Sequence, residues 1–445
     1  MEDFLAMILA LIIFLTTYVL MLTFQKWRPY IALASAAVFI ILGYCGVFEI
    51  NILSALSAVD YNVLLMIGGT MGLVTLFIES KMPARLSELL ITKVPNIKWA
   101  VTVLALFAGI VSAFVDNVAT VLMIAPIGLA ISKKLKISPV PVLIAIAVSS
   151  NLQGAATLVG DTTSILLGGF ADMNFMEFFW MNGKPGIFWG VELGALASIV
   201  VLLILFRKDK QAVNARVETV VEDFFPTIML VGTVVLLIIA SFISEPAEGP
   251  MLTLYNHRSG LICVVMCIIG VARACAKKHN TESLKQVIKD LDKDTLLLLF
   301  GLFMVIEGIQ TAGVIDAIAG LFNRIAGDSP FLLYTLIVFA SVILSAFIDN
   351  IPYVATMLPV VQSIAAMMNG GAGVEPYVFY FGLLTGATLG GNLTPIGASA
   401  NIAAIGILRK NGETVNTKDF LRIGIPFTLA AVLAGYIFIW LVWGI

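Results

Sequence analysis

Ser112-Ala-Phe-Val-Asp-Asn-Val-Ala-Thr-Val-Leu-Met-Ile-Ala-Pro126 recurs later in the chain as Ser345-Ala-Phe-Ile-Asp-Asn-Ile-Pro-Tyr-Val-Ala-Thr-Met-Leu-Pro359. Both copies carry an Asp-Asn pair at the same place and a proline at the end. Asp-Asn is also typical of a plain turn in water, but the residues that flank both pairs are apolar. A duplicated acidic motif within apolar sequence therefore predicts two related halves.

Shorter matches on either side of this motif extend the repeat. Val59-Asp-Tyr-Asn-Val-Leu-Leu resembles Leu291-Asp-Lys-Asp-Thr-Leu-Leu, and Thr157-Leu-Val-Gly160 resembles Thr394-Pro-Ile-Gly397. We predict a first repeat over residues 1–210 and a second over 220–445, joined by the charged stretch 207–222. Each repeat has five spans, one of them broken, and one hairpin. Because five is odd, the second repeat enters the membrane upside down, as in many secondary transporters.

The composition predicts an all-α polytopic membrane protein. Of the 445 residues, 60% are hydrophobic and only 12% are charged, against roughly 25% charged in soluble domains. Many apolar stretches approach the ~20 residues that a helix needs to cross a bilayer. The net charge of -2 gives no indication of nucleic-acid binding. We predict spans near residues 4–24, 30–50, 60–80, 138–170, 186–206, 225–244, 258–275, 294–313, 376–408 and 423–444.

The positions of Lys and Arg predict the orientation, because cytoplasmic loops are enriched in basic residues. With the N-terminus outside, all but three of the 26 basic residues fall inside, Arg28 and Arg216 among them; the exceptions are Lys184, Arg258 and Arg324. Both termini are then outside, and we expect a prokaryotic plasma membrane. The same parity predicts that the stretch 99–133 enters and leaves from the cytoplasm, and 330–368 from outside. Each is then either a full helical hairpin or a re-entrant one whose tip stops inside the membrane, and we predict the re-entrant form.

Two spans are too long for continuous helices. Segments 138–170 and 376–408 each have 33 residues, which would extend about 50 Å across a core of about 30 Å. Small and polar residues interrupt both, and unwound backbone in a membrane is tolerated only where it faces protein or a wet cavity. We therefore predict broken helices beside the binding site.

The paired motifs are the best candidates for an ion site. A carboxyl group at membrane depth is costly and by default functional, and carboxylate and amide oxygens suit a hard cation or a proton site. We predict Na⁺ ligands at Asp116, Asn117, Asp349 and Asn350, with Na⁺ or H⁺ as the coupling ion and no other cofactor. Small polar residues, which could equally be helix-packing contacts, complete the half-sites: Thr120, Asn151, Thr157, Asp161, Thr162 and Ser164 in the first, and Asn392, Thr394, Ser399 and Asn401 in the second.

Other ionisable residues are less informative. Glu307 lies in the middle of a predicted span, where it relays protons or bonds a neighbouring helix. No Lys, Arg or His falls at predicted mid-membrane depth, and such an acid-rich, base-free site favours a cation or a neutral species over a bare anion. Cys263 and Cys267 are one turn apart without a Cys-x-x-Cys pair, which favours packing over coordination of a soft metalloid.

These motifs resemble the ion transporter superfamily, which includes arsenite permeases, sodium/proton antiporters, the melanosomal P protein and divalent anion/sodium symporters. The likeness is greatest to the P protein-like branch. It rests on the first hairpin motif, on Gly390-Gly-Asn-Leu-Thr-Pro-Ile-Gly-Ala-Ser-Ala-Asn401 and on Asp294-Thr-Leu-Leu-Leu-Leu-Phe-Gly. The resemblance implies a scaffold, a mobile transport part that holds both hairpins, elevator-type movement and homodimers.

Two departures from the family pattern concern the site. Dicarboxylate symporters place Ser-Asn-Thr at the hairpin tips, where this chain has Asp116-Asn-Val and Asp349-Asn-Ile. Where the family often has Gly-Asp-Pro-Pro-Asn in the first broken helix, this chain has Gly160-Asp-Thr-Thr-Ser164.

We therefore predict a secondary transporter of a small inorganic ion or small anion rather than an enzyme. Sodium/proton exchange ranks ahead of arsenite efflux, and Na⁺-coupled di- or tricarboxylate symport ranks third; an ion channel is a further alternative. An intramembrane aspartyl protease would also use two membrane Asp residues. The repeat speaks against it, and the only near match to Gly-x-Gly-Asp is Leu158-Val-Gly-Asp161.

Overall fold

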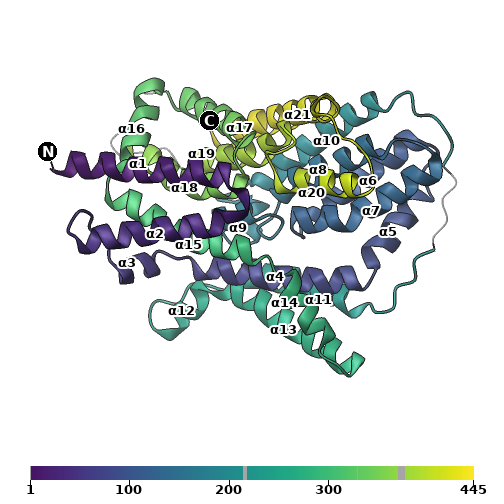
Figure 1. The fold of residues 1–445 in the computed structure, drawn as a ribbon, viewed down its shortest axis with the longest axis horizontal. Coiled ribbons are helices and arrows are strands. Elements are labelled where there is room, and N and C mark those ends of the chain that lie inside the picture. Colours follow the sequence, from purple (N-terminus) through teal and green to yellow (C-terminus); the bar gives the residue numbers. More distant parts are fainter. Residues whose placement is uncertain (1, 214–217, 328, 369–375, 445) are drawn as a thin grey trace.

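The computed structural model describes residues 2–213, 218–327, 329–368 and 376–444; Arg216 lies outside these residues. The described chain is almost entirely helical (Figure 1), and its sheet is one short hairpin of β1 (Trp180–Met181) and β2 (Lys184–Pro185). The predicted fold class, an all-α membrane protein of two inverted repeats with hairpins and broken helices, is confirmed.

The first repeat comprises ten α-helices within the described residues. They are α1 (Glu2–Thr23), α2 (Arg28–Tyr44), α3 (Ile52–Ser57), α4 (Tyr61–Glu79), α5 (Met82–Ile91), α6 (Ile97–Ser112), α7 (Asn117–Leu135), α8 (Pro139–Gly154), α9 (Thr162–Phe170) and α10 (Ile187–Leu205), with 3-10 turns at Gln25–Trp27 and Met176–Phe178.

The second repeat has a similar order of helices. It comprises α11 (Phe225–Ala240), α12 (Pro250–Asn256), α13 (Arg258–Lys278), α14 (Glu282–Asp290), α15 (Lys293–Thr311), α16 (Val314–Ala326), α17 (Pro330–Ser345), α18 (Asn350–Met367), α19 (Tyr377–Leu384), the π-helical turn η4 (Thr385–Leu389), the 3-10 turn η5 (Gly391–Leu393), α20 (Ser399–Lys410) and α21 (Thr417–Trp443).

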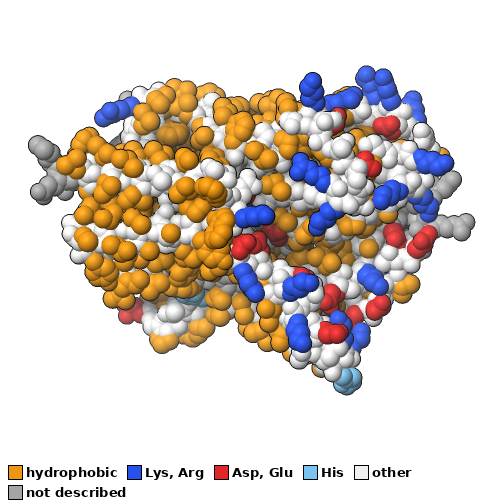
Figure 2. Space-filling view, viewed as in Figure 1, with side chains coloured by type: hydrophobic (Ala, Val, Ile, Leu, Met, Phe, Trp, Pro, Cys, Tyr) orange, Lys and Arg blue, Asp and Glu red, His pale blue; other side chains and the backbone are white. Residues whose placement is uncertain are grey.

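The surface of the molecule fits a lipid environment. Nine helices in the described part of the chain are long and apolar enough to cross a membrane. Figure 2 shows apolar side chains over α1 and α2, whereas Lys and Arg gather towards the opposite end of this face. Large side chains such as Leu5, Val19 and Ile41 are more than half exposed. Exposed apolar area on this scale marks a surface that contacts lipid or protein.

Helices of each repeat pack against helices of the other, in equivalent pairs. The second long helix of each repeat packs along the third long helix of the other, so that α2 lies on α15 and α13 lies on α4. The last helices, α10 and α21, pack against each other. The hairpins α6–α7 and α17–α18 approach from opposite ends of the molecule, and their tips lie in the middle (Figure 1). Such reciprocal packing is the expected result of an inverted repeat.

The breaks in the long spans are built in the same way in both repeats. The helices α8 and α9 are separated by residues 155–161, and α19 and α20 by the short turns η4 and η5. The hydroxyl of Thr157 donates to the carbonyl of Ala113, and the hydroxyl of Thr394 donates to the carbonyl of Ala346. Each break is thus fastened to the hairpin tip of its own repeat.

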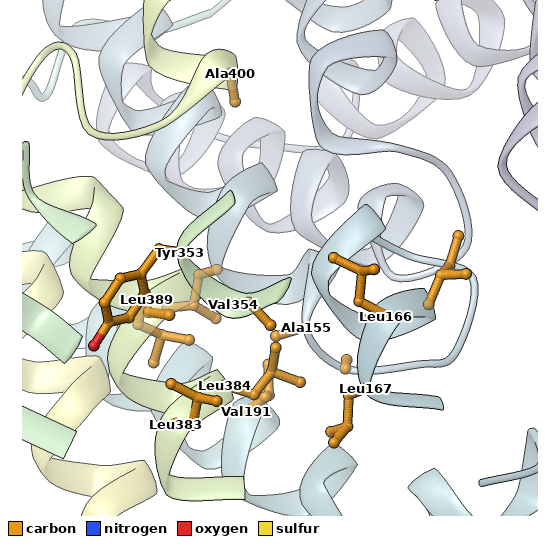
Figure 3. Close-up of a cluster of buried hydrophobic side chains, with 14 of the residues drawn as sticks. Ala155, Leu166, Leu167, Val191, Tyr353, Val354, Leu383, Leu384, Leu389 and Ala400 are labelled. Atoms are coloured by element: carbon orange, nitrogen blue, oxygen red, sulfur yellow. The ribbon is translucent and has the colours of Figure 1, made fainter. Parts of the chain in front are cut away.

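The glycines of these breaks allow very close backbone contact. A methyl group on Gly160 would lie 2.5–2.8 Å from the carbonyl oxygens of Gly154, Ala113 and Ser112. A methyl group on Gly397 would lie 2.6–2.8 Å from three carbonyl oxygens in the equivalent positions. Apolar side chains from both repeats surround the breaks, including Ala155, Val354 and Leu384 (Figure 3). Only glycine fits against the tips at this spacing.

Two short helices, α5 and α16, follow the third long helix of each repeat and were not expected from the sequence. Both helices are short and carry charged residues among their apolar ones, such as Arg85 and Glu88 in α5 and Asp316 and Arg324 in α16. They pack against the second arm of the hairpin in their own repeat, α7 and α18. An amphipathic helix of this length lies along the body of the protein rather than across the bilayer.

Candidate functional site

Both hairpin tips are stabilised by the same local chemistry. Asp116 is the N-cap of α7, and its Oδ1 accepts hydrogen bonds from the backbone N–H groups of Val118 at 3.0 Å and Ala119 at 3.1 Å. Asp349 is the N-cap of α18, and its Oδ1 accepts one from Ile351 at 3.2 Å. Asp is a favoured N-cap residue. In each tip the cap bonds are accepted by Oδ1 and not by the second carboxyl oxygen.

The two tips border one small, partly open cavity. The cavity has a volume of about 40 Å³, enough for a bare ion or a water molecule. Seven of the predicted site residues line it: Asp116, Asn117, Asp161, Thr162, Asp349, Asn350 and Ser399. The remaining lining residues are Met71, Val118, Asp292, Thr295 and Ile351. Four carboxyl groups, from both repeats and from the start of α15, thus border one space.

Arg28 brings a positive charge to this site. Its Nη1 lies 3.1 Å from Asp349 Oδ2, and the hydroxyl of Ser399 donates to the same oxygen at 2.9 Å. The ion pair is largely shielded from solvent, with side-chain exposures of 15% for Arg28 and 9% for Asp349. The prediction of a base-free site is therefore wrong. The sequence places Arg28 in a loop, but its long side chain reaches from the start of α2 to the hairpin tip.

Four asparagines join the repeats behind the cavity. Asn117 Nδ2 donates to Asn151 Oδ1 at 2.9 Å, and Asn350 Nδ2 lies 3.4 Å from the same oxygen. Asn151 Nδ2 in turn donates to the carbonyl of Thr388 at 2.7 Å and to Asn392 Oδ1 at 3.1 Å. Asn151 of the first repeat is therefore bonded to the hairpin tips of both repeats and to the broken helix of the second.

Replacing Asn151 with Ala should destabilise the whole protein. The substitution leaves the amides of Asn117 and Asn350 and two buried acceptors without this partner, and each unpaired buried group costs about 1–3 kcal/mol. We expect a clear fall in the thermal unfolding midpoint of the purified protein in detergent. The control is Asn411→Ala, at an exposed position at the end of α20. Equal midpoints for the two variants would contradict the role of Asn151 as the junction.

Five other predicted residues donate hydrogen bonds to backbone carbonyl groups and do not line the cavity. The Thr157 and Thr394 hydroxyls bind the tips, as described above. Ser164 Oγ donates to the carbonyl of Gly154 at 3.3 Å, and Asn401 Nδ2 donates to that of Gly391 at 3.1 Å, which closes each break. Thr120 Oγ1 donates to the carbonyl of Val115 at 3.3 Å. These side chains position the loops that carry the site.

Glu307 lies away from the hairpin tips. It lines a separate cavity of about 250 Å³ with Asp60, Phe303, Gln310 and Phe170. In the described part of the chain, its carboxyl group makes no hydrogen bond to a neighbouring helix. The structure therefore does not bring Glu307 together with the other predicted site residues.

Several residues at the site were not predicted to belong to it. Asp292 caps α15 by accepting from Thr295 N at 3.0 Å, and it lines the cavity. The sequence already showed that Asp292 corresponds to Asp60 of the first repeat. Thr163 Oγ1 lies 3.0 Å from Thr388 Oγ1 and 3.1 Å from Asp161 Oδ2. No feature of the sequence distinguishes Arg28 from other basic loop residues such as Lys26.

The side-chain groups that line the cavity offer oxygen ligands of the kinds that hard cations prefer. Among the described residues, no three His, Cys, Asp or Glu side chains are close enough to hold one metal ion. A cation here would draw on carboxylate oxygens together with amide and hydroxyl oxygens, the ligands that suit hard ions. Cys263 is buried against α4, close to Gly69, in keeping with packing.

Sequence comparison connects the chain to membrane transporters. The family model described as "CitMHS: Citrate transporter" matches residues 18–384. "Uncharacterized transporter Rv2684" of Mycobacterium tuberculosis is 30% identical over 450 residues, which cover 98% of each chain. The human P protein is 25% identical over 447 residues, which cover 85% of this chain and 53% of that protein. The resemblance to the P protein-like branch is thereby confirmed.

Solved structures show a related fold at much lower identity. The Alcanivorax borkumensis YdaH transporter, whose topology is described as unusual, superposes with a TM-score of 0.59 at 13% identity, over 94% of this chain and 98% of that chain. Neisseria gonorrhoeae MtrF, of a class of antimetabolite efflux pumps, superposes with a TM-score of 0.56 at 15% identity, over 86% and 81%. Both likenesses concern the fold alone.

Proposed function

The chain belongs to the citrate transporter family of integral membrane transporters, and from this premise we propose that it is a secondary active transporter coupled to a cation. In this proposal Na⁺ or H⁺ binds between the hairpin tips, with Asp116 and Asp349 as its principal ligands. Exchange of Na⁺ for H⁺ is the leading form of the activity. One observation carries the proposal: the acidic tips of both repeats border a single small cavity.

The size and charge of this cavity support a cation as its occupant. A space of about 40 Å³ has room for a single ion but not for a di- or tricarboxylate. Four carboxyl groups line the cavity, and an ion pair with Arg28 is formed by Asp349 alone among them, so a bound cation would offset negative charge that is expensive to hold inside a membrane. Asp161 lines the cavity and does not cap α9; one of its carboxyl oxygens, Oδ2, accepts a hydrogen bond from Thr163.

The connections of the hairpins support their movement as one body, as elevator-type transport requires. The asparagine junction ties both hairpins to both broken helices. By contrast, few polar contacts join the second hairpin to α1 and α2. The hydroxyl of Tyr18 donates to the carbonyl of Pro352 at 2.6 Å and lies 2.5 Å from Thr356 Oγ1, and Arg28 binds Asp349. Contacts of this number can be exchanged without unfolding a repeat.

A second candidate function is the cation-coupled symport of a carboxylate such as citrate. The family description favours it, and so does Arg28, because a guanidinium is a common partner of carboxylates. The N-termini of α7 and α18 also point into the site and favour negative charge. In this version the cation would occupy the small cavity, and the carboxylate would bind when the surrounding space is wider.

Transport by the purified protein in liposomes tests both functions. We expect an imposed Na⁺ gradient to drive proton movement, read by an internal pH-sensitive dye, while an equal K⁺ gradient does not. Labelled citrate is tested in parallel with and without Na⁺. Citrate uptake that needs Na⁺, without Na⁺-driven proton exchange, would replace the first function with the second. Absence of both activities in folded protein would contradict the proposed coupling.

A further inference from the structure

The equivalent Asp residues at the two hairpin tips differ in their contacts. At the tip of the second hairpin, Asp349 is paired with Arg28 at 3.1 Å. In the described structure, no Arg or Lys forms an ion pair with Asp116, the equivalent residue of the first hairpin. An inverted repeat that alternates between two states exchanges such contacts between its halves. In the other state, a partner for Asp116 is therefore expected at the position equivalent to Arg28.

That position is given by the packing of α2 and α13. A methyl group on Gly301 of α15 would lie 2.9–3.0 Å from Ala32, and one on Gly69 of α4 would lie 2.5–2.8 Å from Cys263. Gly69 and Gly301 are equivalent because they lie nine residues beyond Asp60 and Asp292, the N-caps of their helices. Ala32 and Cys263 are thus equivalent, which brings Arg258 to within one residue of the counterpart of Arg28.

Arg258 is held without a carboxylate partner. It is the first residue of α13, as Arg28 is of α2. Its guanidinium carbon lies 3.8 Å from the ring centre of Tyr255, and Nη1 donates to the carbonyl of Tyr255 at 2.9 Å. Among the described residues, no Asp or Glu lies within ion-pair distance of it. It lines a cavity of about 480 Å³ that also contains Asp60.

The surroundings of Arg258 repeat the surroundings of Arg28. The cavity at the tips is lined by Asp292 and Met71. Their equivalents in the repeat are Asp60 and Phe303, which line the neighbouring cavity of about 250 Å³. In the present structure the hairpin residues that line this cavity are Ala355, Leu358 and Pro359, which belong to the arm of the second hairpin and not to its tip. Asp60, Phe303 and the nearby Arg258 thus provide the same kinds of side chain as the acid, the large apolar residue and the arginine at the hairpin tips.

We propose that Arg258, Asp60 and Phe303 form a second docking position for the hairpin tips, in which Arg258 pairs with Asp116 when Asp349 leaves Arg28. The inference rests on the proposed function, since it assigns the second position of the transport site. Each arginine stabilises one state by binding a carboxylate that would otherwise be buried and unpaired. Because the two pairs are equivalent, the states remain close in free energy, as alternating access requires.

Cysteine pairs that join the two repeats test this proposal directly. In a variant without Cys45, Cys263, Cys267 and Cys275, the pair Met71→Cys and Ile351→Cys reports the present state, because both residues line the tip cavity. The equivalent pair, Phe303→Cys and Val118→Cys, reports the second state. A protease site inserted between α10 and α11 separates the repeats on a denaturing gel unless oxidation has joined them.

We expect both pairs to join the fragments in membranes, each in part of the molecules. Arg258→Ala should lower the Phe303–Val118 product about tenfold, and Arg28→Ala should lower the Met71–Ile351 product to a similar extent. Arg324→Ala, which removes an exposed charge at the end of α16, should change neither.

Two results would overturn the proposal. One is a Phe303–Val118 pair that never joins the fragments while the Met71–Ile351 pair does. The other is a Phe303–Val118 product that is unchanged by Arg258→Ala. The measurement needs no transported substrate. Cross-linking as expected in a protein without Na⁺/H⁺ exchange or citrate uptake would therefore refute the proposed function and leave the second docking position intact.

Discussion

Asp116→Asn and Asp349→Asn should each abolish cation-coupled transport while leaving a folded protein. Asn is as good an N-cap as Asp, so the hydrogen bonds from Val118, Ala119 and Ile351 to the caps can be kept. The substitution removes the negative charge, and at position 349 it also weakens the pairing with Arg28. A charged hydrogen-bond partner contributes about 1.5–3 kcal/mol, so the affinity for the cation should fall about tenfold to hundredfold at each position.

Liposome flux and cation-dependent thermal stabilisation measure this prediction together. The native protein should unfold at a higher temperature in Na⁺ than in K⁺, because a ligand that binds the folded state stabilises it. Both variants should lose this difference and the Na⁺-driven flux. Asp290→Asn, at an exposed position in α14, should keep both. Normal coupled flux in the two tip variants would move the cation site away from the hairpins.

The sequence was most informative about the hairpins, the broken helices and the meeting of the two tips, because the internal repeat and the thickness of the membrane both restrict these features. The positions of Lys and Arg predicted that each hairpin stretch enters and leaves on one side. The two copies of Asp-Asn within apolar sequence showed that the hairpins are related. The length of segments 138–170 and 376–408 predicted the breaks. The inverted order of spans predicted that Asp116 and Asp349 would lie together at the interface of the repeats. These inferences need only composition, length and symmetry.

The sequence was least informative where the direction of a side chain decides its role. Arg28 and Lys26 are both basic residues near a helix end, and only the packing of α2 on α15 directs Arg28 to the second tip. Thr157 and Thr394 belong to the predicted half-sites, but their hydroxyls bind backbone carbonyls instead of facing the cavity. Small polar residues fill both roles in membrane proteins, and the sequence does not distinguish them.

Gly160→Ala and Gly397→Ala should have the largest effect on assembly. In each case the new methyl group would meet three backbone carbonyl oxygens at 2.5–2.8 Å, and these atoms belong to a hairpin tip and a broken helix. Backbone cannot yield as the far end of a flexible side chain can, so the tip must separate from the break. Overpacking typically costs about 1–3 kcal/mol, and occasionally more. Separation would also expose the asparagine junction.

Gly406→Ala is the matched control. Gly406 lies in α20, in the same broken helix as Gly397, and its added methyl group would meet no atom within 4 Å. Alanine there should be neutral or stabilise the helix by up to about 1 kcal/mol. We expect the yield of monodisperse protein and its thermal midpoint to fall for Gly160→Ala and Gly397→Ala and to be kept for Gly406→Ala. Equal effects in the two repeats follow from their equal contacts. A loss confined to one repeat would show that only that break is fastened to its tip as tightly as the carbonyl distances indicate.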